Sequence, residues 1–413
     1  MSSLPGWPFD KDVQELDTPW TVTSPTRRAV RRLPPFADIP NVPSHVWTLP
    51  GAWLHPNEAA ADILWRDEYR DVLRGILICI ERRLAHLKRL EAEEDYLFPE
   101  ADYLEVNVQP TPTNEPDTFQ NYFDDPSTHN LALRSSILVL TGCPGNGKSF
   151  FLAAIFLLRI AAGLPTVFVR SHTHLLIFRD GHLGEMKPVD YPLDNHLSLN
   201  LPENAWILVD TSDELPNLPP VLKISKHFIV QAASLCDERF KYTRTTGAGC
   251  LIQCVLKPFT IQDILAARSL NRDCHATEAA LVEFFEKYGG SARHAYAEAA
   301  APDRFASEVL RAANALDESR IYDTLHWNVY GFNIATGYSG ISLSAFPTSD
   351  QNRSLYKICP PTPHIAAMLL DRMLVSRADA KIKIVKQTAG VLTAGCQAIA
   401  SGIFDDSLPL GSL

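Results

Sequence analysis

The chain is organised around the stretch Gly142-Cys143-Pro144-Gly145-Asn146-Gly147-Lys148-Ser149. This stretch fills every fixed position of the phosphate-loop pattern, in which glycines let successive backbone N–H groups turn inward around an anion. The lysine supplies a positive charge for the outer phosphates, and the serine hydroxyl can bind Mg²⁺. We therefore expect residues 142–149, together with Phe150, to bind a nucleotide and its Mg²⁺ ion.

The residues on either side have the order that the pattern requires. Residues 136–141 are apolar and β-branched, which predicts a buried strand. Residues 150–159 are mostly helix formers, and no helix breaker occurs before Gly163 and Pro165. The positive end of that helix would add to the anion site. A Gly-rich turn that binds nothing is the alternative, and the flanking strand and helix argue against it.

A second candidate for the same site is the run at 205–210, an apolar segment that ends in Asp210. Downstream of a phosphate loop, this pattern predicts a strand that places a carboxylate beside the Mg²⁺ ion. Thr211 follows, where many ATPases have a glutamate that activates water. Asp213 and Glu214 are the nearest substitutes and are our candidates for that catalytic role.

Further polar residues are candidates for phosphate contacts. A strand is predicted at 227–234, and its polar residues Gln231 and Ser234 are candidates for sensing the γ-phosphate. The segment after it contains glycines and three basic residues, which contact phosphate, act as an arginine finger or are surface charges: Arg239, Lys241 and Arg244.

Composition limits the class of protein. The 413 residues carry a net charge of −10, which argues against unspecific nucleic-acid binding over the whole surface. The N-terminus lacks the pattern of a signal peptide, and the apolar stretch 150–169 is interrupted by Arg159, Gly163 and Pro165, so we expect no membrane span. Eight scattered cysteines suit a reducing compartment. We expect an intracellular protein, in the cytoplasm or the nucleus.

Four residues allow a zinc site as an alternative for part of the chain. Cys250 and Cys254 are followed by Cys274 and His275. Thiols in the core, on one face of a strand, explain the same pattern and are the interpretation that we favour.

The N-terminal part divides into two patterns. Residues 1–55 are rich in proline and predict a mostly irregular arm, whose arginines at 27–32 are a nuclear address, a contact for an acidic partner or a solvated charge run. Residues 57–94 repeat apolar residues at helical spacing and predict one long amphipathic helix, kinked near Gly75. A loop at 106–130 leads into the central strand.

The C-terminal part changes from strands to helices. Strands are expected at 166–170, 175–178 and 250–256, with a turn at Asp180-Gly181. Helices follow from Thr260, as a cap, and at 278–287. Gly289-Gly290 then turns the chain, which places Arg293 at a helix start, either aimed at the phosphates or in an ordinary helix–helix turn. Short strands are expected within 321–360 and helices at 362–376 and 388–401.

The fold class that follows is α/β: a P-loop NTPase with a mainly parallel sheet flanked by helices, a helical lid and a C-terminal α/β extension. We divide the chain into an arm at 1–55, a helix and loop that pack on the core at 56–130, the NTPase core at 131–258, the lid at 259–320 and the extension at 321–413.

Four ordered elements also carry a family resemblance. They are residues 142–149, Trp206–Asp210, the run Lys257-Pro258-Phe259-Thr260-Ile261-Gln262-Asp263-Ile264, and Gly289-Gly290-Ser291-Ala292-Arg293. Over residues 60–405 the chain resembles the ATPase module of Crinkler and retrotransposon-hot-spot proteins, which is AAA-related and STAND-like. The resemblance implies phosphate and Mg²⁺ binding by Lys148 and Ser149, metal binding by Asp210 and a sensor role for Arg293. Members often continue into a nuclease domain after a Gly-x-Phe-Glu-like signature. Here residues 402–405 end in Asp405 near the last residue, so no nuclease is expected.

The expected function is therefore ATP binding with Mg²⁺-dependent hydrolysis, coupled to a conformational change or to a protein partner. ATP is preferred over GTP because no Asn/Thr-Lys-x-Asp motif follows Asp210. A nucleotide-gated interaction protein with little turnover is one alternative, and a small-molecule or nucleoside kinase is another. A homo-oligomer, in which one subunit's arginine completes another's site, is also open.

Overall fold

A computed structural model of the chain describes residues 13–15, 30–32, 45–50, 60–92, 104–108, 121–171, 174–186, 201–211, 215, 226–233, 250–271, 273–315, 341 and 343–373. The chain divides into two compact units. The first comprises Met1–Gly142, Gly147–Leu256 and Pro347–Leu355, and the second comprises Cys143–Asn146, Lys257–Phe346 and Tyr356–Leu413. In the part of the chain that the structure describes, no helix is long and apolar enough to cross a membrane.

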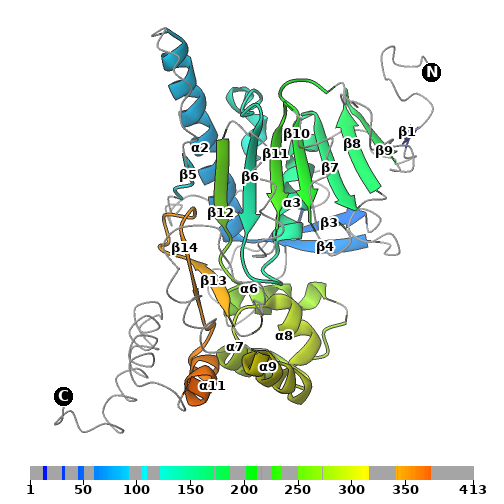
Figure 1. Cartoon of the computed structure of the whole chain (residues 1–413). Coiled ribbons are helices and arrows are strands. Elements are labelled where there is room, and N and C mark those ends of the chain that lie inside the picture. The colour runs from blue at the N-terminus through cyan, green and yellow to red at the C-terminus, as the bar shows by residue number, and fades with distance from the viewer. Residues whose placement is uncertain are drawn as a thin grey trace, which may run out of the picture. The chain divides into compact units, whose positions relative to one another are not determined.

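The first unit is built on a nine-stranded sheet with the order β1-β9-β8-β7-β10-β11-β6-β12-β5 (Figure 1). Six neighbouring strands are parallel: β7 (Thr166–Ser171), β10 (Trp206–Asp210), β11 (Phe228–Ala232), β6 (Ser136–Thr141), β12 (Cys250–Val255) and β5 (Leu104–Glu105). Three antiparallel strands extend one edge: β8 (His174–Arg179), β9 (His182–Met186) and β1 (Val13–Glu15). The prediction of a mainly parallel α/β sheet is confirmed.

The parallel strands are mostly apolar because both faces of the sheet are buried. On one face, residues such as Leu138 and Leu208 belong to a single core cluster with the helices α2 (Asp67–Ala92) and α3 (Lys148–Ala161). On the opposite face, Val139 and Val209 are also fully buried. Burial on both faces is typical of parallel strands and explains why they show no alternation of apolar and polar residues.

The antiparallel edge begins with the hairpin between β8 and β9. Asp180 and Gly181 have φ values of 54° and 81°, so both turn residues are left-handed. A two-residue turn of this kind matches the twist of the paired strands. The turn expected at Asp180-Gly181 is confirmed, whereas β9 was not predicted.

Helix α3 packs against β7, β10 and β11 (Figure 1). Its Arg159 is fully buried, with the guanidinium 4.5 Å from the ring centre of Trp206 and 5.2 Å from that of Phe123. The Nε atom donates to Thr166 Oγ1 at 3.0 Å, and Nη2 donates to the carbonyl of Pro165 at 3.1 Å. Burial lowers the pKa of Arg159 well below its ordinary value. This arginine is therefore a structural link between the helix and the strand that follows it.

The predicted helix at 57–94 is shorter than expected at its N-terminal end. Helix α2 begins at Asp67, and the residues before it form β4 (Ala60–Trp65), which pairs antiparallel with β3 (His45–Pro50), itself paired with β2 (Val30–Arg32). Residues 60–65 are therefore a strand and not the first turns of the helix. Residues 1–55, predicted as a mostly irregular arm, contribute β1, β2 and β3.

Gly75 does not interrupt helix α2, which runs continuously from Asp67 to Ala92. A Cβ at Gly75 would lie 3.1 Å from the carbonyl oxygen of Asn107 and 3.1 Å from a methyl carbon of Val108. Glycine at this position lets the segment around β5 approach the helix closely.

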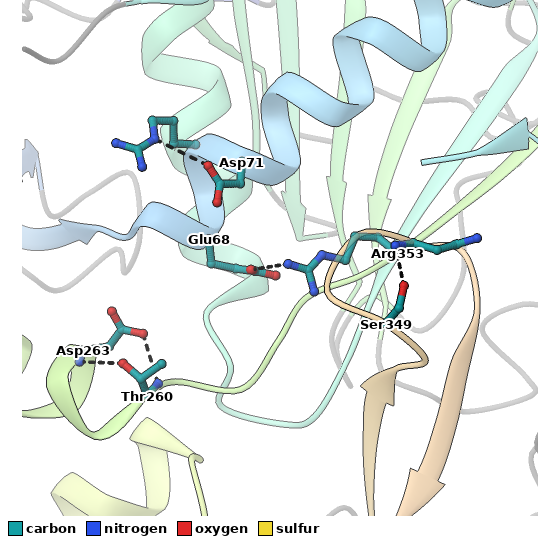
Figure 2. A network of polar contacts seen from close by, with 8 residues as sticks. Glu68, Asp71, Thr260, Asp263, Ser349 and Arg353 are labelled. Atoms are coloured by element: carbon teal, nitrogen blue, oxygen red, sulfur yellow. Dashed lines mark hydrogen bonds and ion pairs between the residues drawn. The ribbon is translucent and has the colours of Figure 1, made fainter. Parts of the chain in front are cut away.

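A segment from the C-terminal part of the chain returns to the first unit at 347–355. Its Arg353 donates its backbone N–H to Val106 at 2.9 Å and accepts from the N–H of Val255 at 2.8 Å. The Arg353 guanidinium forms a buried ion pair with Glu68 of α2, with an N–O distance of 2.9 Å (Figure 2). Sequence patterns assigned this segment to a separate extension, because nothing local marks its return.

The second unit is mostly helical. Its elements are α6 (Ile261–Ala267), η5 (Arg268–Leu270), α7 (Glu278–Tyr288), α8 (Ala292–Glu298), α9 (Asp303–Ala315) and α11 (Pro363–Met373), with β14 (Tyr356–Cys359) paired to β13 (Ser344–Pro347). The predicted cap of α6 is present: Thr260 and Asp263 exchange side chain–backbone hydrogen bonds in a capping box (Figure 2). The helix expected at 388–401, and Trp327 and Tyr330 near the expected strands, lie outside the described residues.

Candidate functional site

The Gly-rich stretch joins β6 to α3, as the sequence predicts. Three of its residues have positive φ: Gly142 at 141°, Gly145 at 77° and Gly147 at 86°. Side chains at these positions would be strained, so glycine is required for the path of the chain. Gly147 is the N-cap of α3 and has no side chain that could cap the N–H groups of the first turn. The backbone is therefore arranged as an open helix N-terminus, which favours an anion.

The Gly147 carbonyl accepts two hydrogen bonds that fix its position. It accepts a hydrogen bond from the hydroxyl of Tyr69 at 2.8 Å and another from the N–H of Phe151 at 2.9 Å. Tyr69 is 1% exposed, so the phenol is fixed in the core while its hydroxyl reaches the start of α3. Sequence reasoning placed Tyr69 only in the apolar stripe of a helix and missed this role. No local signal marks it, because the contact spans 78 residues.

Lys148 lies at the first position of α3 and is partly buried. Its ammonium group donates to the carbonyl of Gly142 at 3.0 Å. The side chain therefore folds back over the start of its own loop. An ammonium has three donors, so Lys148 can hold this carbonyl and still contribute charge to an anion beside the loop.

Ser149 and Asp210 meet although they are 61 residues apart. The Ser149 hydroxyl donates to Asp210 Oδ1 at 3.1 Å. Asp210 is the last residue of β10 and is partly buried, and Ser149 is exposed. The strand end and the helix start thus bring together the two oxygen ligands that the sequence assigns to Mg²⁺.

The spacing of these two oxygens is compatible with a shared Mg²⁺ ion. Mg²⁺ binds oxygen at about 2.0–2.1 Å in octahedral geometry, so two neighbouring ligands lie about 2.9 Å apart. Ser149 Oγ and Asp210 Oδ1 are 3.1 Å apart. Mg²⁺ usually takes only one or two protein ligands and completes its shell with phosphates and water. Within the described ranges, no group of three or more His, Cys, Asp or Glu residues could hold a metal ion.

The tip of the loop, Cys143–Asn146, belongs to the second unit. Its Pro144 carbonyl accepts a hydrogen bond from the Ser291 hydroxyl at 3.1 Å. A Cβ at Gly145 would lie 2.5 Å from Ser291 Oγ and 2.9 Å from the Cβ of Arg293. The loop tip and residues 291–293 are therefore in direct contact. The sequence analysis named Arg293 for this site and missed Ser291. The position of Ser291 within the Gly-Gly-Ser-Ala-Arg run could have identified it.

Arg293 is the second residue of α8 and is exposed. The turn before it is set by two glycines. Gly289 has a φ of 91° and ends α7, and a Cβ at Gly290 would lie only 2.2 Å from the carbonyl oxygen of Phe259. The expected turn at Gly289-Gly290, with Arg293 at a helix start, is confirmed.

The remaining residues of the stretch differ in exposure. Cys143 is buried and its thiol donates to the carbonyl of Ala345 at 3.3 Å, and Asn146 is fully buried. Phe150 is 42% exposed at the start of α3. Cys143 and Asn146 can therefore contribute to a ligand site chiefly through their backbone, whereas Phe150 presents its ring to solvent.

The other candidates of the sequence analysis are buried or lie outside the described residues. Gln231 is 1% exposed within β11. Six candidates lie outside the described residues: Asp213, Glu214, Ser234, Arg239, Lys241 and Arg244. Of the thiols considered for zinc, Cys254 is fully buried, and burial raises its pKa well above the ordinary range. A protonated thiol in the core fits the interpretation of Cys254 as a packing residue.

Neither the protein-family models nor the curated proteins contain a match to this chain.

Proposed function

We propose that the chain binds ATP with Mg²⁺ at the Gly-rich stretch and hydrolyses it, in a cycle coupled to a conformational change or to a partner protein. The observation that carries the proposal is the hydrogen bond between Ser149 and Asp210. A strand, a glycine loop and a helix N-terminus could serve structure alone. A hydroxyl and a carboxylate that converge beside Lys148 from distant parts of the sequence are what Mg²⁺-triphosphate binding needs.

Each residue then has a defined task. The N–H groups at the start of α3 and the ammonium of Lys148 bind the phosphates, and Ser149 and Asp210 hold the metal. When bound, Mg²⁺ neutralises charge on the outer phosphates. ATP is preferred over GTP because the sequence has no guanine-recognition motif after Asp210.

Calorimetry with MgATP tests the proposal directly. Lys148→Ala should abolish detectable binding, whereas Asp210→Asn should keep part of the binding and lose Mg²⁺-dependent phosphate release. Lys226→Ala and Asp180→Asn are matched controls, because both change exposed side chains elsewhere in the same unit. Undiminished ATP affinity in Lys148→Ala would show that the site is wrong.

A nucleotide-gated interaction protein with little turnover is the second candidate, and one observation favours it. Thr211 occupies the position after Asp210, is 7% exposed, and donates its hydroxyl to the carbonyl of Ala232 at 2.5 Å. This side chain has no carboxylate and is already engaged, so it is poorly suited to activating water. A single-turnover assay separates the candidates: a switch retains bound ATP, an ATPase releases phosphate, and a kinase transfers label to an added acceptor.

The relationship to the Crinkler and retrotransposon-hot-spot ATPase module is part of this proposal, as are an intracellular location and a protein partner. The supporting features are the Gly-rich stretch, the run that ends in Asp210 and the Gly-Gly-Ser-Ala-Arg turn. The native mass with ATP, with ADP and without nucleotide tests whether copies of the chain assemble when the site is filled.

A further inference from the structure

The tip of the Gly-rich stretch is a β-turn with a defined hand. The N–H of Asn146 donates to the carbonyl of Cys143 at 3.3 Å, which closes a four-residue turn. The ring of Pro144 fixes φ near −65°, and Gly145 has a φ of 77°. Proline at the second position and a left-handed glycine at the third are the features of a type II turn. A type I turn of the same residues differs by rotation of the central peptide, between Pro144 and Gly145.

Ser291 holds that central peptide. Its hydroxyl donates to the Pro144 carbonyl at 3.1 Å. The chain has no cis peptide bond among the described residues, and in a trans peptide the carbonyl and the following N–H point in opposite directions. The bond that directs the Pro144 carbonyl toward Ser291 therefore directs the Gly145 N–H away from it.

Ser291 is itself fixed in place. The preceding residue, Gly290, accepts a hydrogen bond from the N–H of Phe259 at 3.1 Å. A Cβ at Gly290 would lie 2.2 Å from the Phe259 carbonyl oxygen, so the two backbones are in close contact. Gly145 also packs closely against Ser291, since a Cβ there would lie 2.5 Å from the hydroxyl oxygen. The hydroxyl is thus a built part of the turn and not a mobile surface group.

We propose that Ser291 is a positioning residue for the nucleotide: its hydroxyl selects the type II turn at 143–146, which presents the Gly145 N–H to a bound phosphate. This inference rests on the proposed function. Rotation of the Pro144–Gly145 peptide would replace this donor with a carbonyl oxygen, which repels an anion. Removal of the hydroxyl should therefore weaken phosphate binding although Ser291 itself touches only the loop.

The test uses the full chain with Ser291→Ala and a control of comparable structural cost. Thr260→Ala removes the capping box of α6 in the same unit without touching residues 143–146. Calorimetry gives the MgATP affinity of each variant, thermal unfolding gives its stability, and hydrogen exchange without nucleotide reports on the peptide that covers 142–149.

We expect Ser291→Ala to bind MgATP about 3- to 10-fold more weakly, from the loss of one hydrogen bond, with faster exchange at 142–149. Thr260→Ala should lose stability and keep both the wild-type affinity and the wild-type exchange at 142–149. Wild-type affinity in Ser291→Ala would overturn the role of Ser291 while leaving the nucleotide site intact, and so would an equal loss of affinity in Thr260→Ala. Failure of the unchanged protein to bind ATP would instead refute the proposed function, and with it the phosphate contact of Gly145.

Discussion

Gly145→Ala and Gly163→Ala form a matched pair that measures how tightly the loop tip is packed. Both glycines have left-handed backbones, with φ of 77° and 72°. A methyl group at Gly163 meets nothing within 4 Å, whereas one at Gly145 would lie 2.5 Å from Ser291 Oγ and 2.9 Å from the Cβ of Arg293. Gly163→Ala therefore carries only the backbone cost of about 1–2 kcal/mol. Gly145→Ala adds overpacking and a strained or lost hydrogen bond, so its cost should be larger by about 2–4 kcal/mol.

Urea unfolding of the two variants gives this difference, provided that their m values agree. The double variant Gly145→Ala/Ser291→Gly removes the hydroxyl that the methyl group meets first, so the two changes should be non-additive by about 1 kcal/mol or more. Equal costs for Gly145→Ala and Gly163→Ala would refute the reasoning, because the crowding around Gly145 would then have no energetic consequence. Additivity in the double variant would show that the cost does not come from Ser291.

Three further predictions concern charge. Arg353→Met leaves the carboxylate of Glu68 buried without its guanidinium partner, and urea unfolding should show a loss of about 3–5 kcal/mol, most of which Glu68→Leu added to Arg353→Met should restore. Burial lowers the pKa of His227 and of His294. Below about pH 6.5 the unfolded chain therefore takes up protons that the folded chain does not. The free energy of unfolding should consequently fall as the pH decreases from 7 to about 5. Arg293→Ala should slow ATP hydrolysis with near-normal binding, and unchanged phosphate release would leave Arg293 a structural role only.

Local patterns predicted the elements whose signals are contained in a few residues. The sequence correctly places the strand before the Gly-rich stretch, the strand that ends in Asp210 and the turn at Asp180-Gly181. Strands buried on both faces appear as apolar runs, and a turn with positive φ appears as an Asp-Gly pair. The cap at Thr260 is equally local, since its partner Asp263 is three residues away. These features need no knowledge of the rest of the chain.

Sequence patterns fail where contacts between distant residues determine the local structure. The sequence pattern of residues 60–65 indicates the start of a helix, yet these residues pair with β3 as a strand. A short segment of this kind fits either period. Gly75 makes room for Val108, which lies 33 positions further along the chain, and the local sequence does not indicate this contact. The return of Arg353 to Glu68 spans 285 residues and leaves no periodic signal at either end.

The Gly-rich stretch contains both kinds of residue, those that a local pattern predicts and those that depend on distant contacts. The phosphate-loop pattern fixes Gly142, Gly147, Lys148 and Ser149, and all four belong to the first unit. It leaves the four intervening positions open, and these, 143–146, are the residues that belong to the second unit. Their identities follow from contacts there: proline and glycine make the type II turn that Ser291 holds, and the buried Cys143 thiol donates to Ala345. The fixed positions of the pattern therefore predict the chemistry of the stretch. The residues at 143–146, which set the orientation of the amides at its tip, can be understood only together with the second, helical unit.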